Sequence, residues 1–261
     1  MARRSLSQCR VIVTGASSGI GYQLALELAR EGARLVVTAR RSERLNTLAD
    51  QIRGLGRPVA VVCGDIVDPA VRETLVAEAC NTFGGFDLLI NNAGVSAHGR
   101  FASASSDRLR RIMEVNFFAA AELIRVALPT LAKANRPMVV NVGSILGRRG
   151  LPRNSEYSAS KFALAGLSEA LRPELTRHGI DLLLVNPGTT DTDFFEHLIE
   201  TEETPPWTTR PGVTPEKVAR AIVHAVRRGK HEIVPSLPGR LLLWANRAAP
   251  RLVDLWMKKY G

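Results

Sequence analysis

The chain has 261 residues, 45% of them hydrophobic, which is enough to bury a substantial core within one domain. Its net charge of +10 comes mainly from dispersed arginines, which indicate a solvated surface and argue against nucleic-acid binding, while an acidic partner or a membrane surface stays open. Cys9, Cys63 and Cys80 are scattered, and no signal-like or bilayer-spanning apolar segment is present, so we expect a cytoplasmic protein without a disulfide framework or zinc site.

The first element is a strand that runs into a glycine-rich turn and a helix. Residues 10–14 are β-branched and apolar, and the turn from Gly15 to Gly21 spaces its glycines as Gly-x-x-x-Gly-x-Gly. Apolar residues then recur at helical spacing until Gly32. Glycine lets the backbone approach a phosphate, and the amides at a helix N-terminus stabilise its charge. The unit predicts a dinucleotide-binding turn, although such a turn alone is a weak signal.

Apolar strands and amphipathic helices alternate along the rest of the chain. Further strands are expected at 34–39, 58–63, 87–90, 138–143, 180–185 and 231–235. Further helices are expected from about 68, at about 106–133, 157–175 and 213–228. Strands joined by crossover helices predict an α/β fold with one doubly wound, Rossmann-like parallel sheet.

Three side chains beyond the strand at 138–143 suggest chemistry. Ser144 lies at the carboxyl end of that strand, the edge where open α/β sheets bind ligands. Tyr157 and Lys161 lie four residues apart, on one face of the helix that follows. A phenol loses its proton only near about pH 10, and a neighbouring ammonium lowers that pKa. Taken alone, such a pair is more often an ordinary surface pair, because these pairs are common on helices, so the flanking motifs decide.

Together the motifs resemble those of the short-chain dehydrogenase/reductase family. The turn Thr14-Gly-Ala-Ser-Ser-Gly-Ile-Gly21 is similar to the family's cofactor turn, and Asn91-Asn-Ala-Gly94, Asn116, the Ser144, Tyr157 and Lys161 set and Asn186-Pro-Gly188 follow in the family's order. The resemblance covers roughly residues 8–235. It implies about seven strands in the order 3-2-1-4-5-6-7, a Rossmann-like domain over 8–236 with a substrate lid at about 190–212, and a helical extension over 237–261.

The resemblance also implies roles for individual residues. Ser144 would hydrogen-bond the substrate oxygen, Tyr157 would be the general acid/base, and Lys161 would lower the tyrosine pKa and bind the nicotinamide ribose. Asn116 would bend its helix and anchor a proton relay, the alternative being a structural asparagine. The implied cofactor contacts are Gly15, Ser17, Ser18, Gly19, Ile20, Gly21, Arg40, Arg41, Asp65, Ile66, Asn91, Ala93, Gly94, Tyr157, Lys161, Pro187, Gly188, Thr189 and Thr192. Asp65, expected at the adenine amino group, is explained equally well as a turn or cap residue.

Two arginines follow the second strand and bear on the cofactor. Relatives that prefer NAD resemble one another in carrying Asp at the position of Ala39, and this chain continues with Arg40 and Arg41. Guanidinium groups suit a 2′-phosphate, so NADP(H) is expected. The alternative is that the arginines merely open the next helix.

The segment where the family keeps its lid carries Phe194, Phe195 and Trp207, which indicate an apolar substrate. Ile145, Leu146, Arg149, Glu156 and residues 96–101 are expected to face it. We therefore expect a metal-free, NADP(H)-dependent oxidoreductase of an apolar carbonyl or secondary alcohol, assembled as a homodimer or homotetramer. The alternatives are a 3-oxoacyl-[acyl carrier protein] reductase and a non-catalytic NADP(H)-binding sensor, against which the complete catalytic set argues.

The tail at 237–261 is not explained by the family motifs. Its apolar residues recur at helical spacing among arginines and lysines, and Pro250 is expected to divide it into two helices; the apolar positions are Leu241, Trp244, Ala248, Leu252, Leu255 and Trp256. This composition fits packing on the domain or a second subunit, a cover over the pocket, or a membrane-surface helix. We expect protein packing, so that deletion of 238–261 gives an aggregating or dissociated protein and the intact chain has no appreciable lipid affinity.

Overall fold

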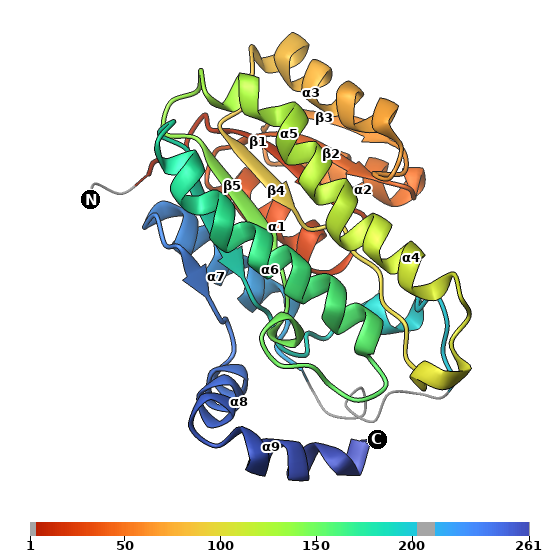
Figure 1. Cartoon of the computed structure of the whole chain (residues 1–261). Coiled ribbons are helices and arrows are strands. Elements are labelled where there is room, and N and C mark those ends of the chain that lie inside the picture. The colour runs from red at the N-terminus through yellow and green to blue at the C-terminus, as the bar shows by residue number, and fades with distance from the viewer. Residues whose placement is uncertain (1–3, 203–211, 261) are drawn as a thin grey trace.

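The computed structural model describes residues 4–202 and 212–260. At its centre is a sheet of seven parallel strands in the order β3-β2-β1-β4-β5-β6-β7 (Figure 1). The strands are β1 (Arg10–Thr14), β2 (Arg34–Ala39), β3 (Val59–Cys63), β4 (Leu88–Asn91), β5 (Met138–Val142), β6 (Asp181–Val185) and β7 (Glu232–Ile233). The predicted strand order and the Rossmann-like doubly wound fold are confirmed.

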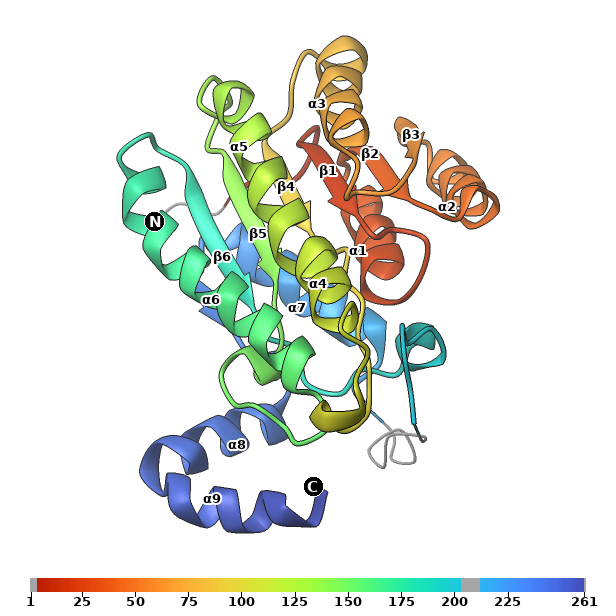
Figure 2. The same ribbon diagram turned by 45° about the vertical axis from the view of Figure 1, so that its right-hand side comes forward.

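Helices cover both faces of this sheet (Figures 1 and 2). One face carries α1 (Gly19–Arg30), α2 (Ser42–Gly54) and α7 (Pro215–Arg227), and the other carries α3 (Pro69–Phe83), α5 (Ala119–Leu131) and α6 (Ser155–Thr176). The short α4 helix (Arg108–Met113) continues into α5 through a π-helical turn at Glu114–Phe118. Single 3-10 turns lie at Phe101–Ser103, Ile145–Gly147, Asp193–Glu196 and Lys258–Tyr260.

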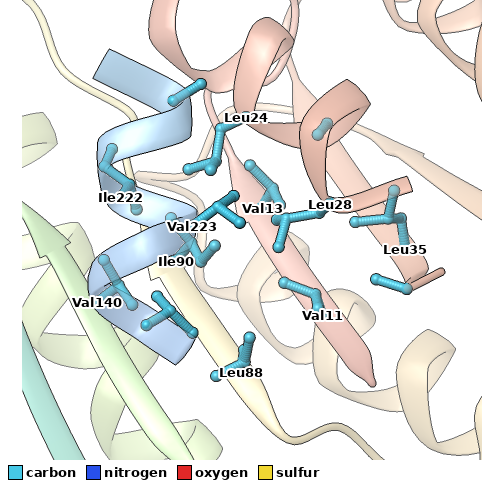
Figure 3. Packing of buried hydrophobic residues seen from close by; sticks show 14 of the residues in the cluster. Val11, Val13, Leu24, Leu28, Leu35, Leu88, Ile90, Val140, Ile222 and Val223 are labelled. Atoms are coloured by element: carbon cyan, nitrogen blue, oxygen red, sulfur yellow. The ribbon is translucent and has the colours of Figure 1, made fainter. Parts of the chain in front are cut away.

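The central strands supply side chains to two separate cores. Val11 and Val13 of β1 pack beside Leu24 and Leu28 of α1, with α7 closing the same cluster (Figure 3). Ile12, between them in sequence, belongs to the opposite cluster under α3 and α5. Each fully buried aliphatic side chain contributes about 1.5–3 kcal/mol. Burial on both faces explains the continuous apolar strands, and it makes the carboxyl edge of the sheet a rigid platform for the site.

The tail forms the two helices that were expected, α8 (Leu237–Ala248) and α9 (Pro250–Met257), with Pro250 beginning the second. Both helices stand off one end of the body (Figures 1 and 2). Leu241, Trp244 and Leu252 are exposed, so most of the apolar stripe does not pack on its own domain, and packing on a second subunit stays a prediction. Among the described residues, no helix is long and apolar enough to cross a membrane.

Candidate active site

A cavity of about 430 Å³ lies at the carboxyl ends of the strands, where the sequence predicts ligand binding. Ser144, Tyr157 and Lys161 lie in its wall together with most of the expected cofactor residues. Those that line it are Gly15, Ser17, Ser18, Gly19, Ile20, Arg40, Arg41, Asp65, Ile66, Ala93, Gly94, Tyr157, Lys161, Pro187, Gly188, Thr189 and Thr192. The wall lacks Gly21, Asn91 and Asn116, and each has a structural position that explains this.

The glycine turn packs closely against the chain that follows β4 and leaves the first amides of α1 without a cap side chain. Gly15 has a φ of +65°, and a Cβ there would lie 2.7 Å from the Cα of Ala93. Ser18 caps α1 without a side-chain hydrogen bond, so no cap side chain occupies the first amides of that helix. Gly21 lies behind the turn, where a Cβ would overlap the carbonyl oxygen of Gly15 and the side chain of Asn92. Its role is to let α1 pack against the turn, a contact the sequence pattern did not distinguish from direct binding.

Arg41 lies against this turn. Its guanidinium donates to the hydroxyls of Ser17, at 3.1 and 3.2 Å, and Ser18, at 2.6 Å. Its Nη1 is buried without a hydrogen-bond partner among the described residues, with the carboxylate of Asp193 at 3.6 Å. Arg44 pairs with the same carboxylate at 2.6 Å. An unsatisfied guanidinium nitrogen in a cavity wall suits an added anion.

The neighbouring residues Asn91 and Asn92 take different positions at the end of β4. Asn91 was expected to line the cofactor path, but its side chain is buried in the sheet and donates to Oδ1 of Asn141 at 2.9 Å. Asn92 lines the cavity instead and donates to the carbonyls of Thr14, at 3.0 Å, and Gly15, at 3.1 Å. Successive strand residues point to opposite sides, and the motif alone does not fix which asparagine faces the ligand. Asp65 both lines the cavity and accepts from the amide of Val67 at 3.1 Å, so its two interpretations coexist.

The catalytic candidates converge from two elements. Ser144 follows β5, Tyr157 and Lys161 project from the first turns of α6, and the Ser144 hydroxyl hydrogen-bonds that of Tyr157. Lys161 donates to the carbonyl of Val142 at 3.0 Å, and its Nζ lies 5.8 Å from the centre of the Tyr157 ring. A Cβ on Gly147 would lie 2.6 Å from the Lys161 carbonyl, so this glycine allows α6 to approach the loop that carries Ser144.

Burial dominates the ionisation of this pair. It raises the pKa of Tyr157 to about 12, with the Ser144 hydrogen bond opposing part of the rise. It also lowers the pKa of Lys161 to about 8. The low-dielectric surroundings penalise both charged forms, and the lowering of the tyrosine pKa by Lys161 stays a prediction.

Asn116 lies in the π-helical turn between α4 and α5. Its side chain accepts from the amide of Val95 at 2.8 Å and donates at 2.9 Å to both the Val95 carbonyl and the Ser160 hydroxyl. A Cβ on Gly94 would lie 3.3 Å from Asn116 Oδ1 and 3.5 Å from Lys161 Nζ, so these two side chains flank the same glycine. The irregular turn thus places Asn116 beside the lysine but outside the cavity wall.

Glu156, expected to face the substrate, is buried in an ion pair. Arg108 of α4 binds its Oε1 at 2.6 and 2.9 Å, and both residues are almost fully buried. The same guanidinium donates to the Arg100 carbonyl at 3.2 Å and lies 3.7 Å from Glu200. This pair ties the residue before Tyr157 to α4 and to the segment after the 3-10 turn at Asp193–Glu196.

Apolar side chains complete the cavity on the substrate side. Phe194 lies 6.1 Å from Tyr157 between ring centres, and Phe195, Leu146 and Leu151 also line the wall. Pro205, Pro206 and Trp207 of the expected lid lie outside the described residues. Of the lining residues that the sequence did not predict, four lie in the tail: Leu242, Trp256, Met257 and Tyr260. Their signal was the helical apolar spacing, which does not reveal what the helices cover.

The fold and cavity define a dinucleotide-binding protein of the doubly wound α/β class. Residues 10–203 match the family model described as short chain dehydrogenase. The ketoacyl reductase HetN of Nostoc sp. is 31% identical over 259 residues, covering 96% of this chain and 88% of HetN. The chain therefore belongs to the short-chain dehydrogenase/reductase family, whose members are nicotinamide-dependent oxidoreductases.

Solved structures agree on the fold. A short chain dehydrogenase/reductase from Burkholderia phymatum in complex with NAD has a TM-score of 0.88 and 23% identity, covering 95% of this chain and 96% of that one. A short chain dehydrogenase from Burkholderia cenocepacia in complex with NADP has a TM-score of 0.79 and 28% identity, covering 88% and 97%. Both nicotinamide cofactors thus occur on this fold.

Proposed function

We propose that this protein is an NADP(H)-dependent oxidoreductase that interconverts a carbonyl and a secondary alcohol of an apolar substrate, with Tyr157 as general acid/base. The observation that carries the proposal is the convergence of Ser144, Tyr157 and Lys161 in one cavity with the glycine turn. A nucleotide site and a proton-transfer pair in one cavity are what hydride transfer to a carbonyl requires.

The residues present fit the cofactor. The first amides of α1 carry no cap side chain and suit a pyrophosphate. Arg41, whose Nη1 has no hydrogen-bond partner among the described residues and faces Asp193 at 3.6 Å, suits a 2′-phosphate, with Arg40 beside it in the wall. We also assign to NADP(H) the other expected cofactor residues that line the cavity wall. Gly21 and Asn91 do not line the wall and would act indirectly: Gly21 allows α1 to pack against the turn, and Asn91 holds the sheet. When bound, the nicotinamide supplies or accepts the hydride.

The protein residues handle the proton and the substrate oxygen. Tyr157 gives its hydroxyl proton to the oxygen in reduction and takes one in oxidation, and Ser144 donates a hydrogen bond to the same oxygen. At pH 7 a Lys161 pKa of about 8 leaves the ammonium mostly protonated, so it stabilises the phenolate as that forms. Asn116 anchors the relay that returns the proton, because it holds the bent backbone next to Lys161.

The cavity lining favours an apolar substrate, since Leu146, Phe194, Phe195 and Met257 flank the tyrosine side. The test is a panel of apolar ketones, aldehydes and secondary alcohols in which turnover is followed by the absorbance of NADPH. Tyr157→Phe is expected to retain NADPH binding and to lose turnover by about 10²–10⁴-fold. Full turnover in this variant would refute the assignment of the acid/base.

A second candidate is reduction of a 3-oxoacyl group on an acyl carrier protein, which the similarity to a ketoacyl reductase favours. It predicts activity on carrier-bound substrate and little on simple ketones. Binding of NADPH without turnover on either class would instead favour a non-catalytic sensor.

We also propose a homodimer or homotetramer in a reducing compartment. Oligomers are usual among soluble enzymes, and the three cysteines are free thiols. Light scattering of the purified protein measures the subunit number directly.

A further inference from the structure

Two apolar stripes on the tail are exposed to solvent. On α8 the residues Leu237, Leu241 and Trp244 follow one another at spacings of three and four, and they are 63%, 58% and 71% exposed. On α9 the neighbours Leu252, Leu255 and Trp256 are also exposed, while Val253 and Met257 face inward. Large exposed apolar side chains gathered on two adjacent helices mark an interaction surface, and we call these six residues the tail patch.

Basic residues border these stripes. Between positions 237 and 260 the chain has five basic residues, Arg240, Arg247, Arg251, Lys258 and Lys259, all exposed, and one acidic residue, Asp254. Asp254 is already paired with Arg149 at 2.6 Å. The patch therefore presents apolar side chains with an uncompensated positive rim.

An aromatic and cationic cluster ends the tail. The Lys259 ammonium lies 4.3 Å from the centre of the Trp256 ring and 5.0 Å from that of Tyr260. Rings with one apolar and one polar end, close to cations, are typical of residues at the boundary between lipid tails and headgroups. Both helices thus have the composition of helices that lie in the plane of a membrane surface.

The positive charge around the patch favours a lipid surface over a second copy of the chain as its partner. A twofold contact between two such patches would bring like-charged rims together, in a protein whose net charge is already +10. Anionic lipid headgroups complement the same rim, and the acyl region accepts the leucines and tryptophans. We propose that α8 and α9 dock this protein on the surface of an anionic lipid bilayer.

Docking would bring the cavity next to the lipid. Trp256 is half exposed on the patch and also lines the cavity, where Leu242, Met257 and Tyr260 join it. An apolar substrate dissolved in the bilayer would then reach Tyr157 without crossing water. This route rests on the proposed function, whereas docking does not, so binding is tested without turnover.

The experiment is cosedimentation of the intact protein with phosphatidylcholine vesicles, with and without phosphatidylglycerol, at low and high salt. Trp244→Glu is the test variant, because Trp244 is exposed and lies outside the cavity wall. Leu55→Glu is the matched control, because it introduces the same charge at another exposed apolar residue. Leu55 follows α2, near the edge of the sheet opposite to β7, after which the tail begins. Thermal unfolding of both variants checks that they fold.

We expect salt-sensitive pelleting with anionic vesicles, at least about tenfold weaker in Trp244→Glu and unchanged in Leu55→Glu. Absence of pelleting, or pelleting that Trp244→Glu does not weaken, overturns the proposal. A smaller oligomer in Trp244→Glu, with no vesicle binding by the unaltered protein, also overturns it and assigns the patch to a second subunit. Tyr157→Phe is expected to bind vesicles normally, so loss of the reaction and loss of docking are separate results.

Discussion

Cofactor selectivity depends on how Arg41 divides its contacts between the glycine turn and a phosphate. In the structure its guanidinium is held by Ser17 and Ser18 and faces Asp193 at 3.6 Å. Arg41→Ala removes the cation that we assign to the 2′-phosphate. A hydrogen bond to a charged group contributes about 1.5–3 kcal/mol, which corresponds to roughly a tenfold to hundredfold loss of NADPH affinity. Because the arginine side chain is 34% exposed, we expect the lower part of this range.

The carboxylate of Asp193 works against the same phosphate. It is bound by Arg44 at 2.6 Å and approaches Arg41, so a phosphate entering there meets a like charge. Exposed ion pairs contribute about 0–1 kcal/mol, so Asp193→Asn is expected to tighten NADPH binding by no more than about fivefold and to leave NADH unchanged.

Titration of NADPH and NADH by calorimetry separates these effects. Arg41→Ala should weaken NADPH and leave NADH within about threefold, since NADH lacks the 2′-phosphate. Arg44→Ala is the matched control, because it shares Asp193 but lies outside the main cavity wall. Equal loss of both cofactors in Arg41→Ala would refute the phosphate contact and leave Arg41 a brace for Ser17 and Ser18.

Three further variants test the frame of the site. Arg108→Leu leaves the buried Glu156 carboxylate without its partner, and urea unfolding is expected to show a free energy of unfolding lower by about 3–5 kcal/mol. Adding Glu156→Leu to this variant should restore most of the loss, and no recovery would contradict a buried ion pair. Gly21→Ala should lower the free energy of unfolding by about 1–3 kcal/mol and weaken cofactor binding. Gly166→Ala is the control, because a methyl group at Gly166 meets open space and should not destabilise the protein; equal effects of the two variants would show that the turn tolerates the methyl group. Trp256→Ala should raise KM for apolar substrates by about tenfold with kcat nearly unchanged, and an unchanged KM would remove α9 from the substrate wall.

The hydrophobic periodicity and the order of the motifs were sufficient to predict the fold, because both are properties of short segments that can be recognised without knowing the tertiary contacts. Continuous apolar strands report burial on two faces, and the glycine turn and Asn186-Pro187-Gly188 mark strand ends. The Tyr157 and Lys161 spacing placed both side chains on one helix face before any tertiary contact was known.

Tertiary contacts decided the residues that sequence misplaced. Glu156 is next to Tyr157 in sequence, yet the helix turns it toward Arg108, a partner 48 positions away. Asn91 and Asn92 differ only in which side of the strand end they face. The tail pattern indicated helices with apolar stripes, but their exposure depends on packing that no local pattern encodes.

The two opposed pKa shifts predict how the reaction depends on pH. Reduction needs Tyr157 protonated, and a pKa of about 12 keeps it so throughout the neutral range. Oxidation needs the phenolate, whose fraction grows tenfold per pH unit far below that pKa. Below the Lys161 pKa of about 8 the ammonium remains in place, so log kcat/KM for alcohol oxidation should rise with pH at a slope of about one while that for reduction stays level. Initial rates in both directions, with matched ionic strength and saturating cofactor, measure the two slopes. A plateau of the oxidation rate near neutrality would show that bound cofactor lowers the tyrosine pKa by several units, and burial would then not control ionisation in the working enzyme.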